Sequence, residues 1–95
     1  FVEDHARGNI KAINPQSKNE IINLSNETIN IQHLAKLILK ELGSTQKCNV
    51  VEFARPGDHL GEKSFDCSKA EQLLGWKPTV SIETGIKRCY EWLKQ

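Results

Sequence analysis

The stretch Asp66-Cys67-Ser68-Lys69-Ala70-Glu71-Gln72-Leu73-Leu74-Gly75-Trp76-Lys77-Pro78 carries the strongest fold signals in the chain. Asp66 and Ser68 are both good N-caps, so either one can begin a short helix over residues 69–74. Gly75 follows at the place where helices commonly end in a left-handed residue. The stretch therefore predicts a short helix that stops at Gly75.

The residues after Gly75 lead into a second helix. Pro78 holds Lys77 in extended geometry, so the short helix cannot resume. Trp76 is then free to lie flat over the hydrophobic core. Ser81 is an N-cap for a last helix, with Ile82, Ile86, Cys89, Tyr90 and Leu93 repeating at helical spacing.

Two features of this last helix need an interpretation. Cys89 lies on the predicted apolar face, so we expect a small buried hydrophobe rather than a reactive thiol. Tyr90 and Lys94 form a literal Tyr-x-x-x-Lys pattern. Since Tyr90 belongs to the same apolar face, we interpret the pattern as a coincidence of spacing.

Upstream lies the loop Arg55-Pro56-Gly57-Asp58-His59. Pro followed by Gly suits a tight turn, which would aim Arg55 and Asp58 outward on the same side. A planar guanidinium beside a carboxylate suits a ligand with an anionic oxygen and vicinal hydroxyls, such as a nucleoside diphosphate. His59 is placed where a ligand phosphate could meet it. The alternative is a surface ion pair in an ordinary turn, which is common and nearly neutral in energy.

The rest of the chain predicts two more helices and two or three short strands. Val2, Ala6, Ile10 and Ile13 recur at helical spacing, which predicts a helix over residues 3–14. Asn30 caps a helix over residues 31–42, on whose polar face Lys36 and Lys40 are expected to meet solvent. Short β-branched runs at residues 20–24 and 48–53 predict strands, and residues 63–65 a third brief one.

Composition limits the class of protein. The 95 residues suffice for one domain, residues 1–95, with 38% hydrophobic and 26% charged residues, as in globular proteins. The net charge of +1 gives no basic surface for nucleic acid. No run approaches the roughly 20 apolar residues of a membrane span.

Three widely spaced cysteines predict reduced thiols in the cytoplasm. A start without Met or a signal peptide suggests a piece of a longer chain.

Catalytic and metal motifs are missing from the sequence. It contains no GxGxxG turn, P-loop, GxSxG elbow or HExxH, and His5, His33 and His59 are not at metal-ligand spacing. We therefore predict no catalytic residue, no cofactor-binding residue and no metal site in this chain.

Taken together, the chain resembles the C-terminal third of extended short-chain dehydrogenase/reductases, the NAD(P)-dependent nucleotide-sugar epimerases and 4,6-dehydratases. Four stretches carry the resemblance: Phe1-Val2-Glu3-Asp4-His5-Ala6, similar to "YVxDxA"; Ile22-Asn23-Leu24, similar to "YNL"; Arg55-Pro56-Gly57-Asp58; and the Asp66 to Pro78 stretch, similar to "D-x-S-K-A-x-x-x-L-G-W-x-P". Ser81 to Gly85 is similar to the "S-x-E-x-G" that usually follows.

The resemblance implies a fold, a cofactor and a substrate. The fold would be an α/β or α+β-like fragment of about four helices and two or three short strands, without the Rossmann core. The missing N-terminal domain of the parent enzyme would bind NAD(P), and this chain none. Arg55 would bind the diphosphate of a nucleotide sugar and Asp58 its ribose. The parent would be a cytoplasmic homodimer with no nucleic-acid or membrane partner. The alternative is a non-catalytic binding or interaction module on the same scaffold.

Overall fold

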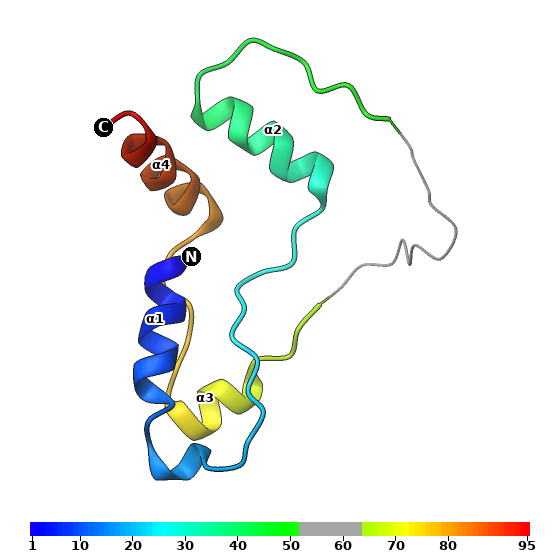
Figure 1. The fold of residues 1–95 in the computed structure, drawn as a ribbon. Helices are drawn as coiled ribbons and strands as arrows, with labels where there is room; N and C mark the ends of the chain where they lie inside the picture. Colours follow the sequence, from blue (N-terminus) through cyan, green and yellow to red (C-terminus); the bar gives the residue numbers. More distant parts are fainter. Residues whose placement is uncertain (52–63) are drawn as a thin grey trace.

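The structure is a computed structural model that describes residues 1–51 and 64–95. Five helices make up its regular structure: α1 (Val2–Lys11), the 3₁₀ helix η1 (Pro15–Ser17), α2 (Ile31–Glu41), α3 (Ser68–Leu74) and α4 (Ile82–Leu93). They form two groups (Figure 1), because α1 and η1 pack on α3, while α2 packs beside α4. None of the helices in these residues is long and apolar enough to cross a membrane.

The helix ends confirm the predicted caps. Asn30 Oδ1 accepts the Gln32 N–H at 2.8 Å at the start of α2, and the Ser81 hydroxyl accepts the Thr84 N–H at 3.2 Å at the start of α4. Gly75 ends α3 with φ of 56°, in the left-handed region.

Asp66 provides the side-chain cap of α3. Its Oδ1 accepts the Ser68 N–H at 2.8 Å, although Cys67 occupies the N-cap position itself. Hydrogen bonds from the backbone and the hydroxyl of Ser68 lower the pKa of Asp66, outweighing the opposite effect of burial. Of the two predicted caps, Asp66 is therefore the one that serves α3.

The predicted strands are wrong in the part of the chain that the structure describes. Residues 20–24, 48–51 and 64–65 contain no strand, so the expected α/β or α+β-like fold is replaced by a helical one. Strands need a neighbour whose N–H and C=O groups complete the ladder. Residues 22–25 instead attach to α3 by other contacts: the Asn23 side-chain amide donates to the Asp66 carbonyl, and the Ser25 N–H donates to Cys67 Sγ at 3.2 Å.

The core lies where α3 meets this extended segment. Ala70, Leu74 and Trp76 are buried, and Ile22, Leu24, Cys67 and Leu73 pack against them. Trp76 is only 2% exposed, which confirms its predicted position over the core. Ile22 and Leu24 thus pack against the core without forming a strand, whereas the preceding Ile21 is 88% exposed.

Helix α1 is shorter than predicted and presents a different face. It ends at Lys11, and Val2, Ile10 and Ile13 are 71%, 69% and 82% exposed. Its buried residues are Asp4 and Gly8. A Cβ on Gly8 would lie only 3.1 Å from Trp76 Nε1 and would overlap the Leu24 side chain. The close approach of Trp76 and Leu24 to the α1 backbone therefore favours glycine at this position, because a larger residue would force both side chains to shift.

In the second group of helices, α2 and α4, the burial of one residue differs from the prediction. Leu37 of α2 and Gly85 of α4 are buried, and the Phe1 ring lies close to Gly85, so the chain start meets α4 (Figure 1). Cys89, however, is exposed, so its predicted role as a buried hydrophobe is wrong. Helical spacing defines a face, but it cannot tell how much of that face a neighbouring helix covers.

Candidate functional site

The predicted substrate-binding residues Arg55, Asp58 and His59 lie outside the described residues, within 52–63. The described chain reaches this loop at Val51, which is 81% exposed, and resumes at Ser64, which is also exposed. Val51 and Ser64, which flank residues 52–63, are therefore both exposed, and the described geometry concerns the framework formed by residues 1–51 and 64–95.

Asp4 is the centre of that framework. Its side chain is 3% exposed, and hydrogen-bond donors surround its carboxylate. The carboxylate accepts the Val80 N–H at 2.9 Å, the Thr79 N–H at 3.0 Å and the Thr79 hydroxyl at 2.8 Å. Arg7, one turn along α1, adds an ion pair at 2.8 Å. One carboxylate thus ties α1 to a segment more than 70 residues away.

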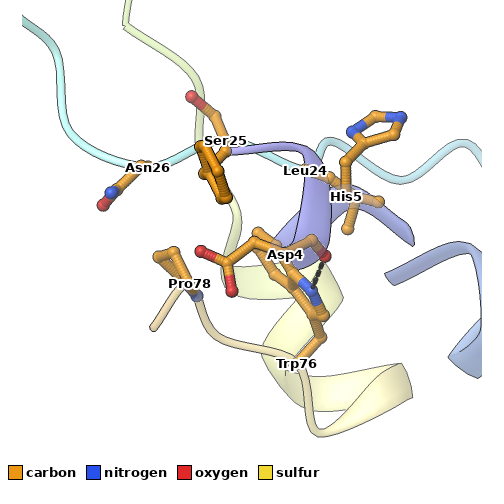
Figure 2. A pocket seen from close by; sticks show the side chains of 8 residues that line it. Asp4, His5, Leu24, Ser25, Asn26, Trp76 and Pro78 are labelled. Atoms are coloured by element: carbon orange, nitrogen blue, oxygen red, sulfur yellow. Dashed lines mark hydrogen bonds between the residues drawn. The ribbon is translucent and has the colours of Figure 1, made fainter. Parts of the chain in front are cut away.

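Two neighbouring contacts extend this tie. The Trp76 indole N–H donates to the backbone carbonyl of Asp4 at 2.8 Å, drawn as a dashed line in Figure 2. The Asn26 side-chain amide donates to the Val80 carbonyl at 2.9 Å. Helix α1, residues 24–26 and residues 76–80 are therefore joined by hydrogen bonds as well as by packing.

The contacts of Asp4 fix its charge. Burial by itself raises the pKa of Asp4, but the hydrogen bonds from Val80 and Thr79 and the charge of Arg7 outweigh it, and they lower the pKa from 3.8 to about 2. Both oxygens are occupied by donors. Asp4 is therefore an ionised structural group, and it is unsuited to act as a general acid or base at neutral pH.

This pKa predicts how stability depends on pH. The pKa of Asp4 is lower in the folded chain than the ordinary 3.8, so its stabilisation is fully present above about pH 4 and is lost as the pH falls toward 2. Urea unfolding at pH 5, 3.5 and 2.5 measures this, with Asp4→Asn as the variant that cannot titrate. We expect the difference in stability between the two proteins to become smaller as the pH falls from 5 to 2.5. A difference that stays constant would contradict the assignment.

A small hollow adjoins Asp4 (Figure 2). It lies between the start of α1, residues 24–26 and residues 76–78, with a volume of about 50 Å³. Pockets for small-molecule ligands are usually about 300 Å³ or more. The His5 ring points away from the Asp4 carboxylate in this view. The hollow has room for water but not for a nucleotide.

Sequence reasoning missed the role of Asp4, because an acidic residue in a first helical turn is usually explained by the helix dipole. The signal that could have found it is the aspartate in the stretch from Phe1 to Ala6, which matches the "YVxDxA" pattern.

At the other end of the chain, Lys94 Nζ lies 4.0 Å from the centre of the Tyr90 ring. The ammonium packs on the ring face, which supports the interpretation of this pair as coincidental.

Comparison with known proteins gives relatives along the whole chain. It is 33% identical over 97 residues to a UDP-glucuronate 4-epimerase from Thermodesulfobacterium geofontis, an alignment that covers 100% of this chain and 29% of that protein. It is 32% identical over 101 residues to dTDP-glucose 4,6-dehydratase 1 from Escherichia coli, covering 97% of this chain and 27% of the relative. The chain thus spans less than a third of the length of these relatives. No family model and no solved structure matches it.

Proposed function

Since this chain belongs to the extended short-chain dehydrogenase/reductases, the family of nucleotide-sugar epimerases and dehydratases, we propose that it binds the nucleoside diphosphate of a nucleotide sugar. The parent enzyme would be an NAD(P)-dependent 4-epimerase or 4,6-dehydratase. The observation that carries the proposal is the stretch Arg55-Pro56-Gly57-Asp58, set in a chain similar over its full length to enzymes named for UDP and dTDP sugars.

The chemistry of the loop suits this ligand. Arg55 offers a planar fork of N–H donors that can bind a diphosphate through two oxygens. Asp58 offers a carboxylate that can accept hydrogen bonds from ribose hydroxyls, and His59 adds a second group for a phosphate. Binding at this non-reacting end positions the sugar for chemistry elsewhere in the parent enzyme.

The nicotinamide cofactor would be held elsewhere. This chain has no Gly-rich dinucleotide turn, and its one Tyr-x-x-x-Lys pattern, at Tyr90, has the lysine packed on the ring. We therefore assign no residue of this chain to NAD(P), and we expect the 95 residues alone to bind a nucleotide sugar without converting it.

We also propose a cellular location and an oligomeric state for the parent enzyme. Cys48, Cys67 and Cys89 are all free, which is compatible with a reducing cytoplasm. By family resemblance we propose a homodimeric parent, which light scattering of the parent enzyme would test.

Calorimetric titration with UDP, dTDP, GDP and CDP sugars tests the binding role. We expect one base to bind best and Arg55→Ala to weaken that binding about tenfold or more, because a charge-assisted hydrogen-bonded pair is lost. Arg88→Ala is the matched control. Arg88 makes an exposed ion pair with Glu3 and lies over the Phe1 ring, and it has no assigned role in ligand binding, so its loss should leave the affinity unchanged.

Equal weakening by the two arginine variants would contradict the assignment of Arg55. Absence of affinity for all four nucleotide classes, together with binding to a protein partner, would favour the alternative of a non-catalytic interaction module.

A further inference from the structure

A second hollow lies at the C-terminal end of α2, apart from the predicted loop. It is open to solvent and has a volume of about 470 Å³. Its lining comes from two elements, the last turns of α2 and the segment that follows: Lys36, Leu39, Lys40, Ser44, Gln46 and Lys47, with Cys48 at its edge. Three of these residues are lysines, and none is acidic.

The three lysines are not explained by local structure alone. Lys40 lies in the last turn of α2, where a positive charge favours the helix dipole, but Lys36 lies a turn earlier and Lys47 beyond the helix. Lys36 and Lys40 are four residues apart, a spacing at which like charges destabilise a helix slightly. Among the described residues, none of the three forms an ion pair. An anion in the hollow would relieve this repulsion.

The turn after α2 brings further donors to the same place. Gly43 has φ of 63°, and the Ser44 N–H donates back to the Leu39 carbonyl at 2.9 Å, so the chain folds toward the helix end. The Ser44 hydroxyl accepts the Gln46 N–H at 3.2 Å and keeps its own hydrogen to donate. The Leu39 side chain supplies an apolar wall.

From this arrangement we propose that the hollow binds a small ligand carrying two or more phosphate charges. Three ammonium groups with a hydroxyl and an amide match a pyrophosphate-like group in charge and in donors. Nucleic acid fits less well, because its binding usually requires more phosphate contacts than three lysines provide, and the net charge of the chain is only +1. The inference does not depend on the role proposed for Arg55.

Inorganic pyrophosphate is the probe that tests this site on the 95-residue chain. Titration followed by amide NMR should give saturable shifts at Leu39, Ser44 and Gln46, with an affinity that falls as salt is added. Lys36→Gln and Lys40→Gln should each weaken binding about fivefold, the upper range for an exposed charge pair. A triple variant that also carries Lys47→Gln should abolish it, with circular dichroism to verify the fold.

Lys18→Gln is the matched control, because Lys18 is the residue that ends η1 and does not line the hollow. Equal weakening by Lys18→Gln, shifts that do not saturate, or shifts confined to other residues would overturn the proposal. Tighter binding of a single-stranded oligonucleotide than of pyrophosphate would overturn the ligand class. Arg55→Ala should leave the pyrophosphate shifts intact, so this test and that of the nucleotide-sugar proposal can fail separately.

Discussion

Replacing Trp76 with alanine is expected to lower the free energy of unfolding by about 4 kcal/mol, the usual cost of deleting a buried tryptophan. The indole is 2% exposed and packs with Ala70 and Leu74. The indole N–H also donates a hydrogen bond to the Asp4 carbonyl, and the alanine variant would lose this bond. Since small domains have only about 5–15 kcal/mol of stability, this loss removes a large share of it, and the Trp76→Ala protein should unfold at a clearly lower urea concentration. Urea unfolding followed by circular dichroism measures the effect.

The second tryptophan of the chain provides the control. Trp92 lies on α4 and is 70% exposed, so Trp92→Ala makes the same chemical change without opening a cavity. We expect its effect to stay within about 0.5 kcal/mol. Similar losses in the two variants would mean that the core is not centred on Trp76.

Replacing Asp4 with asparagine is expected to cost about 3 kcal/mol at neutral pH, because the donors around the buried carboxylate are left unsatisfied. Asparagine has nearly the same size, but its amide N–H₂ would face the N–H groups of Thr79 and Val80, and Arg7 would lose its counter-charge. Thermal unfolding should show a melting temperature lower by about 15 °C for a domain of this size.

The neighbouring carboxylate is the matched control for Asp4. Glu3 is exposed, and its one ion pair within residues 1–51 and 64–95 is with Arg88, at 2.6 Å. Such pairs contribute little, so Glu3→Gln should change the stability by less than about 1 kcal/mol. If Glu3→Gln cost as much as Asp4→Asn, general charge effects rather than the buried tie would explain the loss.

Helix ends were predictable because their signals are local. Asn30, Ser81 and Gly75 each act within a few residues, and the structure shows each in its expected cap. The position of Trp76 was also predictable, since Pro78 and Gly75 leave it little choice but to fold onto the short helix.

Strands and the buried faces of helices were less predictable, because both depend on partners that are distant in sequence. Residues 20–24 have a β-branched pattern, but in the described part of the chain no neighbouring strand completes their ladder. On α1, the apolar pattern pointed to Ile10, yet the helix turns Gly8 inward, where Trp76 and Leu24 lie close to its backbone. The tie between Asp4 and Thr79 spans 75 positions, so the pattern around Asp4 could mark the aspartate but not identify its partner.

The candidate site was predicted from the chemistry of Arg55, Asp58 and His59 and from family resemblance, and its geometry lies outside the described residues. The lysine hollow beside α2 was not predicted. Lys36 and Lys40 were expected to meet solvent as single side chains, and only the fold of residues 43–47 brings Lys47 next to them.

Amide NMR of the chain titrated with UDP-glucose and dTDP-glucose tests the central claim most directly. The account predicts saturable shifts at residues 55–59 with one of these ligands, and their loss in Arg55→Ala while the amides of Thr79 and Val80 keep their folded positions. Unchanged binding in Arg55→Ala, or ligand shifts that leave residues 55–59 unaffected, would contradict it.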